Sequence, residues 1–559
     1  MSFSRRTFLK NTAAAAALSI AGPGAFSPLL RAGARSAAGN PLRIPADLVG
    51  TQLVGAPVMD ELLPGTQTPA YGLNGTYLGP LIRRNRGERF TVQMLNNIPD
   101  QDLILHWHGI FAPEEMDGHP RYAVGTGETY DYDFLIDQRA GTYWYHSHTD
   151  MITGPQVYKG LAGFFIVHDE EEQGLGLPSG EYDVPLAIQD KRVTENFELI
   201  YDPSPADVMR GWQGDTILVN GTPEAVFSAA RTLYRFRLLN AANARVWKIA
   251  FSDMRTFHLI AGDGGLLEKP VEVDSFYLPP GARAEILVDF SNDVQGTEVL
   301  LRSVAFQAEG SAGSRQGKPA DLMTISIDRD GSSGGVVPGT LSSIEKFDPE
   351  EAVRVRDFRV HMVDGKHGIN NLLFGMNRVD FEVPFDELEI WEFFNPTQVI
   401  HPMHVHGVQF QIIERSGGIW PEEQGWKDTV LLFPFDRVRV ALRFVAHRGV
   451  FMLHCHNLEH EDDGMMMNFG VVGLGAVENG HRPGGYLQAW PNPVLDHTTV
   501  RCGPASVRRK LVLSDMRGRE VMRRIVPAYA ERAVLDLSGL AAGVYWCRVG
   551  TESLAITKK

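Results

Sequence analysis

A fourteen-residue segment that begins at His454 reads HCHNLEHEDDGMMM and concentrates side chains that bind soft metal ions. Side chains alternate between the two faces of an extended strand, so Cys455 should point one way and its neighbours His454 and His456 the other. One metal could then lie on the thiolate side and two more on the imidazole side, joined through two peptide units over a gap on the order of 10 Å. Two imidazoles, one thiolate and a long, weak Met ligand form a blue-copper electron-transfer site. Cys455, His460 and Met465 supply three of these four ligands.

Three further histidine motifs lie earlier in the chain: HWHG at residues 106–109, HSH at 146–148 and HPMHVHG at 401–407. Each HxH pair sets two imidazoles on one strand face with Cα atoms about 6.6 Å apart, so that each ring can reach a different metal of one cluster. A single HxH pair usually means two buried structural histidines, but four pairs in one chain do not fit that explanation. Eight histidines divide as three, three and two over three copper ions, and His401 is the candidate for the fourth blue-copper ligand. The eight are His106, His108, His146, His148, His404, His406, His454 and His456.

The order and spacing of the four motifs resemble those of the multicopper oxidases, the family of laccases, bilirubin oxidases, cuprous oxidases and ferroxidases. The resemblance covers residues 45–475, and no ligand position is vacant or substituted. That matters because some relatives keep this fold without copper and serve as structural proteins. The resemblance implies four copper ions per chain. It assigns His401, Cys455, His460 and Met465 to the type 1 copper, His106 and His404 to the type 2 copper, His108, His146 and His456 to one type 3 copper, and His148, His406 and His454 to the other.

The resemblance also implies a reaction. The type 1 copper takes electrons singly from a reducing substrate through His460 or His401, and Cys455 passes them towards the three-copper cluster. Four such transfers reduce O2 to two waters.

Four protons must reach the oxygen, and hydrogen-bonded carboxylates suit proton relay. Glu461 and Asp117 match the two acidic relay positions of the family. The alternative for both is an exposed or capping carboxylate. Without the resemblance, that alternative would be favoured for Glu461, because it lies in an acidic run with Asp462 and Asp463.

The motifs leave two classes of electron donor open. One is a laccase-like oxidation of phenols or aromatic amines, and the other is oxidation of Cu(I) or Fe(II) in copper tolerance. Cuprous oxidases often carry a Met-rich insert, whereas the 17 Met here are scattered apart from residues 465–467, which favours an aromatic donor. Glu422, Glu423 and Asp428 could instead recruit a cation, although a solvated loop is the more ordinary explanation.

Other classes of protein fit the sequence less well. A copper nitrite reductase needs far fewer histidines in this geometry, and a non-catalytic envelope protein would not need a complete ligand set. The formal net charge of −15 argues against nucleic acid or an anionic membrane as a partner and is explained by solubility.

The N-terminal residues describe an export signal. The segment SRRTFLK at residues 4–10 precedes an Ala-rich apolar run at residues 12–21, which Gly22-Pro23-Gly24 ends. The run is too short to cross a bilayer stably. Twin arginines followed by Phe and Leu resemble a twin-arginine signal, which carries folded proteins. We expect residues 1–38 to form such a signal, cleaved near Ala34 or Ala38, and the protein to be exported to the periplasm, cell surface or medium; a disordered basic tail is the alternative.

The rest of the chain is strand-like. Val92, Met94, Leu103 and Leu105 alternate with polar neighbours, Gly-Pro and Asn-Gly turns punctuate the runs, and helical periodicity is scarce. We predict an all-β protein of three cupredoxin-like Greek-key β-barrel or sandwich domains at residues 42–170, 181–330 and 350–475.

The second of these domains is predicted to be a spacer that shapes the assembly. It has strand candidates at residues 217–219, 233–239 and 284–288 but no HxH pair, and its single His258 is interpreted as structural. Its Pro280-Gly281-Ala282-Arg283 phrase resembles the middle domain of three-domain multicopper oxidases. Because the first and third domains contribute four cluster histidines each, the cluster is expected between them.

A tail at residues 486–559 follows, which an oxidase does not need. Its Asn492-Pro493, a hairpin candidate around Met516-Arg517-Gly518 and Gly543-Val544-Tyr545 resemble the small β-sandwich sorting domain of type IX secretion cargo. Export and secretion machinery are therefore expected partners; an accessory β module is the alternative. Cys502 and Cys547 could form one disulfide in an oxidising compartment or remain two thiols.

Overall fold

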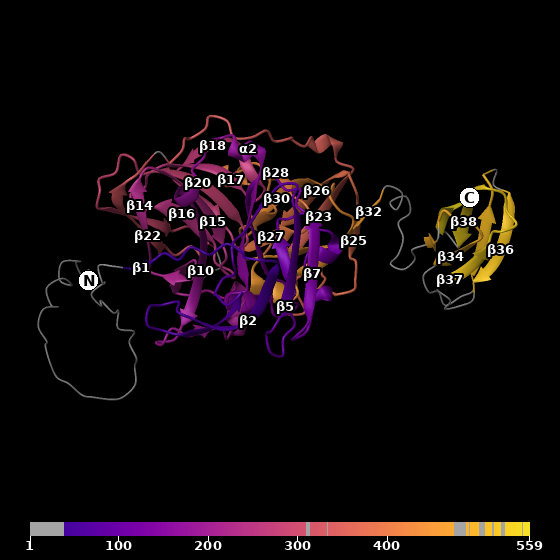
Figure 1. Ribbon diagram of the computed structural model, residues 1–559, viewed down its shortest axis with the longest axis horizontal. Coiled ribbons are helices and arrows are strands. Elements are labelled where there is room, and N and C mark those ends of the chain that lie inside the picture. The colour runs from indigo at the N-terminus through magenta and orange to yellow at the C-terminus, as the bar shows by residue number, and fades with distance from the viewer. Residues whose placement is uncertain are drawn as a thin grey trace, which may run out of the picture. The chain divides into compact units, whose positions relative to one another are not determined.

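The computed structural model of the chain describes residues 39–308, 314–332 and 334–473 and, in the tail, residues 488–490, 492–501, 509–516, 519–526, 532–549 and 552–559. The predicted signal peptide therefore lies outside the described residues. Strands dominate the described chain (Figure 1), as predicted. Its four α-helices have six residues or fewer: α1 (Thr153–Tyr158), α2 (Glu170–Gln173), α3 (Pro205–Arg210) and α4 (Leu458–Asp463). Among the described residues no helix is long and apolar enough to span a membrane.

The first domain consists of two four-stranded sheets. One has the order β3-β2-β5-β7 and the other β4-β9-β8-β6. The alternate β5 residues Phe90, Val92 and Met94 are buried in one apolar cluster, in which the Phe90 ring meets the rings of Trp107 and Phe165 edge to face, each at 5.1 Å. The strands are β2 (Gln52–Asp60), β3 (Thr68–Leu73), β4 (Ile82–Asn85), β5 (Arg89–Asn96), β6 (Leu105–His108), β7 (Thr129–Leu135), β8 (Gly141–Ser147) and β9 (Ala162–His168).

The second domain pairs a six-stranded sheet, β1-β14-β22-β21-β16-β19, with a larger one of order β13-β12-β10-β15-β20-β17-β18 that also carries β11. The predicted strands at 217–219, 233–239 and 284–288 are confirmed as β12, β15 and β20. The strands are β1 (Asn40–Pro41), β10 (Asp183–Val193), β11 (Leu199–Ile200), β12 (Thr216–Val219), β13 (Thr222–Pro223), β14 (Ala225–Arg231), β15 (Leu233–Asn240), β16 (Trp247–Phe251), β17 (Phe257–Gly262), β18 (Gly265–Val273), β19 (Ser275–Leu278), β20 (Arg283–Asp289), β21 (Thr297–Ser303) and β22 (Ala320–Asp330).

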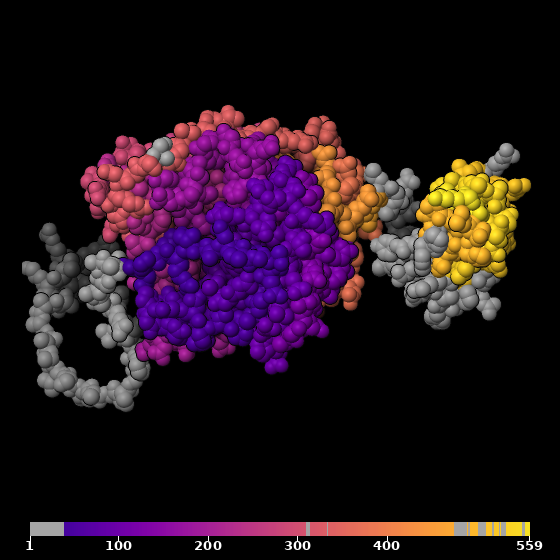
Figure 2. Space-filling model, viewed as in Figure 1, coloured from indigo at the N-terminus to yellow at the C-terminus, as the bar shows by residue number. Residues whose placement is uncertain are grey.

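The third domain has two five-stranded sheets, β24-β23-β26-β30-β28 and β25-β32-β31-β27-β29. It adjoins the first domain, as the indigo and orange surfaces in Figure 2 show, and the Val450 N–H donates to the Glu114 carboxylate at 2.8 Å. The strands are β23 (Arg354–Val363), β24 (Lys366–Ile369), β25 (Phe381–Pro384), β26 (Leu388–Phe394), β27 (His401–Val405), β28 (Phe410–Arg415), β29 (Thr429–Leu432), β30 (Arg437–Arg443), β31 (Gly449–Cys455) and β32 (Met466–Val472).

The tail forms a small sandwich of its own, with sheets β33-β34-β37 and β36-β35-β38-β39. The predicted hairpin is confirmed, because β35 (Arg509–Ser514) pairs antiparallel with β36 (Glu520–Val526). Cys547 is buried, whereas Cys502 lies outside the described residues, so the proposed disulfide stays a prediction. The other strands are β33 (Gln488–Trp490), β34 (His497–Arg501), β37 (Arg532–Asp536), β38 (Gly543–Val549) and β39 (Glu552–Lys558).

Candidate metal centre

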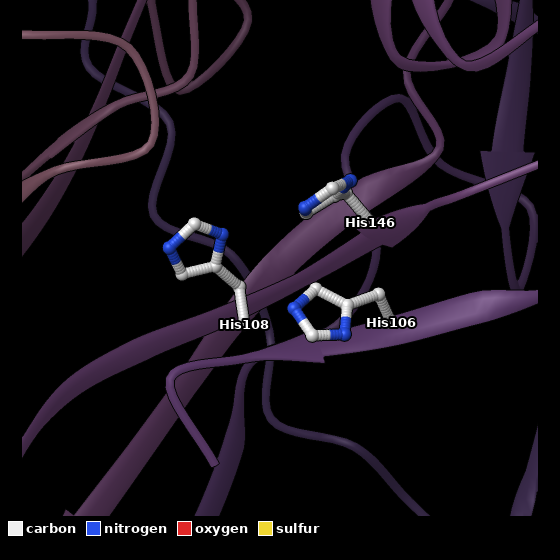
Figure 3. A group of neighbouring side chains, drawn as sticks. All are labelled: His106, His108 and His146. Atoms are coloured by element: carbon white, nitrogen blue, oxygen red, sulfur yellow. The ribbon is translucent and has the colours of Figure 1, made fainter. Parts of the chain in front are cut away.

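Two antiparallel strand pairs present the histidine motifs. In the first domain β6 pairs with β8 so that His106 lies opposite His146, and in the third domain β27 pairs with β31 so that His404 lies opposite His454. Residues two apart on a strand share a face, so each pair gathers two HxH motifs. Figure 3 shows the rings of His106, His108 and His146 gathered beside the strands of the first pair.

Cys455 ends β31, and its Sγ atom lies 3.6 Å from Nδ1 of His401 and 3.6 Å from Nδ1 of His460. The two Nδ1 atoms are 3.1 Å apart, so three potential ligand atoms surround one position. Met465 is buried in the same hydrophobic cluster as Cys455; its N–H donates to the His460 carbonyl, and its own carbonyl accepts from the Cys455 N–H. The Asn457 N–H donates to Sγ at 3.5 Å. The arrangement can hold one soft metal ion in an apolar surrounding.

The other eight motif histidines are buried and converge from the first and third domains. Nε2 of His404 lies 3.4 Å from Nε2 of His106. Nε2 of His454 lies 3.0 Å from that of His406 and 3.3 Å from that of His148. A third group, with ring centroids 5.0 to 5.8 Å apart, consists of His108, His146 and His456.

Hydrogen bonds fix which ring nitrogen faces the centre of this cluster. In four histidines Nδ1 donates to a backbone carbonyl: His106 to Asp117 (2.5 Å), His146 to Ser147 (2.8 Å), His404 to Asp428 (2.9 Å) and His454 to Cys455 (3.1 Å). A neutral imidazole carries one N–H, so Nε2 of these rings keeps a lone pair for a metal. His108 is reversed, because its Nε2 donates to the Asp428 carboxylate at 3.0 Å and Nδ1 is left over.

The protonation states suit metal binding. Burial lowers the pKa of His146 and His148 to about 3, and burial together with the nearby His367 does the same for His401. These rings are therefore neutral near pH 7, as metal-binding imidazoles must be. Burial raises the pKa of the Cys455 thiol, so binding of a metal there would release a proton.

Several buried ring nitrogens have no partner within the protein. Among the described residues they are Nδ1 of His108 and of His148, Nε2 of His146 and both nitrogens of His456. A buried polar atom without a hydrogen bond costs free energy, which a bound cation would offset. Imidazole, thiolate and thioether groups are the donors that copper prefers, so the residues present fit copper.

Two buried carboxylates contact the histidine cluster. Oε2 of Glu461 lies 3.0 Å from Nδ1 of His454, and its Oε1 lies 3.7 Å from Nε2 of His148. Burial raises the pKa of Glu461, but the two facing imidazoles outweigh burial and lower the pKa below its usual value. Asp117 accepts a hydrogen bond from Nδ1 of His406 at 2.7 Å, and burial raises the pKa of Asp117 well above its usual value. The alternative interpretation of both as exposed carboxylates is wrong.

The acidic residues considered for cation recruitment are buried as well. Asp428 is fully buried beside the cluster, Glu423 forms an ion pair with Arg415, and Glu422 accepts a hydrogen bond from the Tyr277 N–H at 2.8 Å. All three hold elements together, so neither a cation-recruiting surface nor a solvated loop describes them. No sequence pattern predicted this arrangement, because the partners of these residues lie on other strands or in the second domain.

The second domain, predicted to be a spacer that shapes the assembly, reaches both sites. The carbonyl of Met209 in α3 accepts a hydrogen bond from Nε2 of His460 at 3.4 Å. The guanidinium of Arg283, at the start of β20, binds the Asp428 carboxylate. His258 lies in β17, is part-exposed and belongs to none of the metal-binding groups among the described residues.

His367 is a site residue that sequence reasoning missed. It lies on β24, outside every HxH motif, and its ring stacks on that of His460 with centroids 3.8 Å apart. Its Nδ1 lies 3.0 Å from a carboxylate oxygen of Asp463, which orients the ring. No local pattern around a single histidine could have placed it there.

Family models agree with this geometry. Models described as multicopper oxidase match residues 58–172, 198–303 and 346–473, and a secretion system C-terminal sorting domain matches residues 488–559. The laccase of Bacillus subtilis is 30% identical over 465 residues, covering 71% of this chain and 89% of that protein. The cell division protein FtsP of Proteus mirabilis is 31% identical over 482 residues, covering 83% of this chain and 98% of that protein.

Solved structures lead to the same family. McoA, a multicopper oxidase from Aquifex aeolicus, superposes with a TM-score of 0.72 at 36% identity, covering 78% of this chain and 99% of that chain. Relatives named laccase and bilirubin oxidase are oxidoreductases that use O2. The chain belongs to the multicopper oxidases and ends in a secretion sorting domain.

Proposed function

We propose that the protein couples four one-electron oxidations of a reducing substrate to the reduction of O2 to two waters. One observation carries the proposal: Cys455 meets His401 and His460, while its neighbours His454 and His456 turn towards the histidine cluster. Bound copper, one ion at Cys455 and three in the cluster, supplies the one-electron steps and the place where O2 is reduced. The test is O2 uptake by the copper-loaded chain with a reductant; release of H2O2 as the main product would contradict it.

The ligand assignment is the one that the family resemblance implies, and several of the close approaches described above support it. We assign His401, Cys455, His460 and Met465 to type 1 copper, His106 and His404 to type 2, His108, His146 and His456 to one type 3 ion, and His148, His406 and His454 to the other. The close approaches of Nε2 atoms support the pairing of His106 with His404 and of His454 with His406 and His148. A complete ligand set distinguishes this chain from a purely structural use of the fold.

Protons reach the cluster through the two carboxylates. Glu461 contacts Nδ1 of His454 and lies near His148, so its carboxylate can accept a proton and pass it on beside the place where O2 is reduced. Asp117 accepts a hydrogen bond from Nδ1 of His406 and orients that ring. We therefore assign Glu461 to proton delivery and Asp117 to both relay and orientation.

The scattered methionines of the sequence favour a phenol or an aromatic amine as the electron donor, as in a laccase-like reaction. One structural observation favours Cu(I) as a second candidate. Nε2 of His460 faces the Met209 carbonyl, and Nε2 of His401 lies 3.2 Å from the Thr397 hydroxyl. Both rings are buried, so an aromatic donor cannot contact them directly. The Met209 side chain is 37% exposed, and its thioether is a donor that suits Cu(I).

Parallel rate measurements with a phenol, Fe(II) and Cu(I) separate these donors. If Cu(I) is the donor, Met209→Leu lowers the rate with Cu(I) and leaves the rate with the phenol unchanged. Met254→Leu is the matched control, because Met254 is another exposed methionine of the same domain. Equal rates with Cu(I) in both variants would leave the aromatic donor as the better candidate.

The sorting domain supports delivery of the enzyme beyond the inner membrane. We propose that residues 1–38 direct export and that residues 486–559 then present the folded protein to outer-membrane secretion machinery, so that it acts in the periplasm, on the cell surface or outside the cell. Removal of the tail should leave the enzyme copper-loaded but retained in the periplasm. A truncated protein that still reaches the cell surface would refute the sorting role.

A further inference from the structure

A turn of the second domain touches the histidine cluster at two points. Gly281 has a φ of +81°, and a Cβ added to it would lie 2.7 Å from the ring of His456. Two residues on, β20 begins with Arg283, whose side chain is completely buried. The turn therefore packs against the cluster, although it contributes no candidate metal ligand.

The guanidinium of Arg283 forms a bidentate ion pair with the Asp428 carboxylate. Nη1 donates to Oδ1 at 2.9 Å, and Nη2 donates to Oδ2 at 2.5 Å. The remaining donors bind backbone carbonyls, with Nε to Thr142 at 3.0 Å, Nη1 to Gly281 and Nη2 to Asp263 at 2.9 Å each. Because every N–H of the guanidinium group is hydrogen-bonded, the group cannot rotate. The plane of the Asp428 carboxylate is therefore fixed as well.

The fixed carboxylate determines the orientation of His108. Oδ1 of Asp428 accepts from Nε2 of His108 at 3.0 Å and from the Thr429 hydroxyl at 2.9 Å. An ionised carboxylate only accepts hydrogen bonds, so Nε2 must carry the proton of this neutral ring. Nδ1 of His108 then keeps its lone pair, and it is one of the buried nitrogens that lack a partner.

We propose that Arg283 is a positioning residue of the three-copper cluster, acting through Asp428 to present Nδ1 of His108 to a copper ion. The inference rests on the proposed function and deepens it. The second domain thereby becomes part of the catalytic assembly. Gly109 is consistent with this role, since it follows His108 at a φ of +86° and an added Cβ would lie 2.6 Å from Nη2 of Arg283.

The first test separates geometry from charge. Arg283→Met removes the guanidinium group, and Arg283→Lys keeps the positive charge but cannot make a bidentate contact with the carboxylate. Both should weaken cluster copper binding by about 10- to 100-fold in a titration of the apo full chain, because that is the usual effect of losing a group that orients a ligand. The absorption of the type 3 pair should fall, while the blue absorption of the Cys455 site stays. An Arg283→Lys chain that binds copper like the wild type overturns the proposal.

The second test asks whether Arg283 acts only through Asp428. In an Asp428→Ala background, Arg283→Met should cause no further loss of cluster copper, because the intermediary is already gone. Losses that add would show that Arg283 acts by another route and would overturn the inference.

Arg237→Met is the matched control. Arg237 is an equally buried arginine of the same domain that pairs with Glu285 and Asp183, neither of which belongs to a candidate metal-binding group of the described residues. It should lower the melting temperature without changing cluster copper affinity; an equal loss of copper affinity would reduce Arg283 to a structural role. A wild-type chain without copper would instead refute the proposed function, whereas a fully loaded wild type with unaffected Arg283 variants would refute this inference alone.

Discussion

The Cys455 site and the histidine cluster are built in different ways. His401, Cys455, His460 and Met465 all come from the third domain, within one stretch of 65 residues, and two paired strands with the short helix α4 are enough to bring them together. The cluster takes four histidines from each of two domains, and Asp428 beside it forms an ion pair with Arg283 of a third. The proposed ligands of the first site therefore come from one domain, although the Met209 carbonyl of the second domain contacts His460, whereas those of the second site meet at a domain interface.

Their surroundings differ as well. Cys455 and Met465 belong to the hydrophobic core of the third domain, with Met403 and Phe451 in the same cluster of apolar side chains. The histidine cluster is surrounded by the buried carboxylates of Asp117, Asp428 and Glu461. An apolar site suits transfer of electrons alone, whereas reduction of O2 consumes protons and needs groups that hold them.

Cys455→Ser gives the largest effect, because it removes the thiolate and leaves the interface intact. The blue absorption should disappear and oxidase activity should fall to background, since no other thiol lies near His401 and His460 among the described residues. Absorption spectra and O2 uptake measure both. A variant that remained blue and active would refute the assignment of the site.

Glu461→Gln should affect only the cluster. Loss of a positioned proton donor costs on the order of 100-fold in rate, so reoxidation of the reduced enzyme by O2 should slow by about that factor. Stopped-flow absorption follows the reaction, and the blue band should keep its intensity. Asp462→Asn is the control, since this neighbouring carboxylate binds the N–H groups of Thr153 and Gly154 instead. Unchanged turnover in Glu461→Gln would remove Glu461 from proton delivery.

Asp117→Ala should weaken copper binding at the cluster without affecting the Cys455 site. The variant loses the hydrogen bond that orients His406, and such a loss reduces metal affinity by about 10- to 100-fold. Copper titration with electron paramagnetic resonance separates the two sites. Equal losses at both would mean that Asp117 supports the fold generally.

The smallest effect concerns the interface of the second and third domains. Burial raises the pKa of Glu422 to about 7, so its contribution to stability is complete below the usual pKa of 4.5 and is lost as the pH rises through about 7. At pH 8, Glu422→Gln should therefore melt at a higher temperature than the wild type, with a free energy of unfolding larger by at most about 3 kcal/mol. At pH 4 the substitution should give no gain in stability.

Calorimetry at the two pH values checks this prediction. Glu423→Gln is the control, because Glu423 pairs with the buried Arg415 and its loss should destabilise the protein at both values. A gain in stability at pH 4 equal to that at pH 8 would contradict the raised pKa of the buried Glu422 carboxyl.

Sequence reasoning worked where spacing along one strand sets the geometry. The alternation around Cys455 and the HxH pairs predicted which side chains share a face, and the structure brings those side chains together. It failed where a helix turns neighbours in different directions. In α4, Glu461 faces His454, Asp462 caps α1 and Asp463 binds His367, although the three adjacent acids suggested one solvated run.

It also failed where a partner comes from another domain. Asp428 meets Arg283 from 145 residues away, and the Met209 carbonyl meets His460 from 251 residues away. One sequence carries no record of such contacts, because neither partner shows a pattern that points to the other. The interface residues could therefore not be assigned before the fold was known.

Copper counts on the purified wild type and Cys455→Ser chains, measured side by side, test the central claim most directly. If one ion lies at the thiolate and three lie behind its two flanking histidines, the wild type holds four copper ions and the variant holds one fewer, with its cluster signals unchanged. Equal counts in the two chains, or loss of the cluster copper together with the blue ion, would contradict the separation of the two sites.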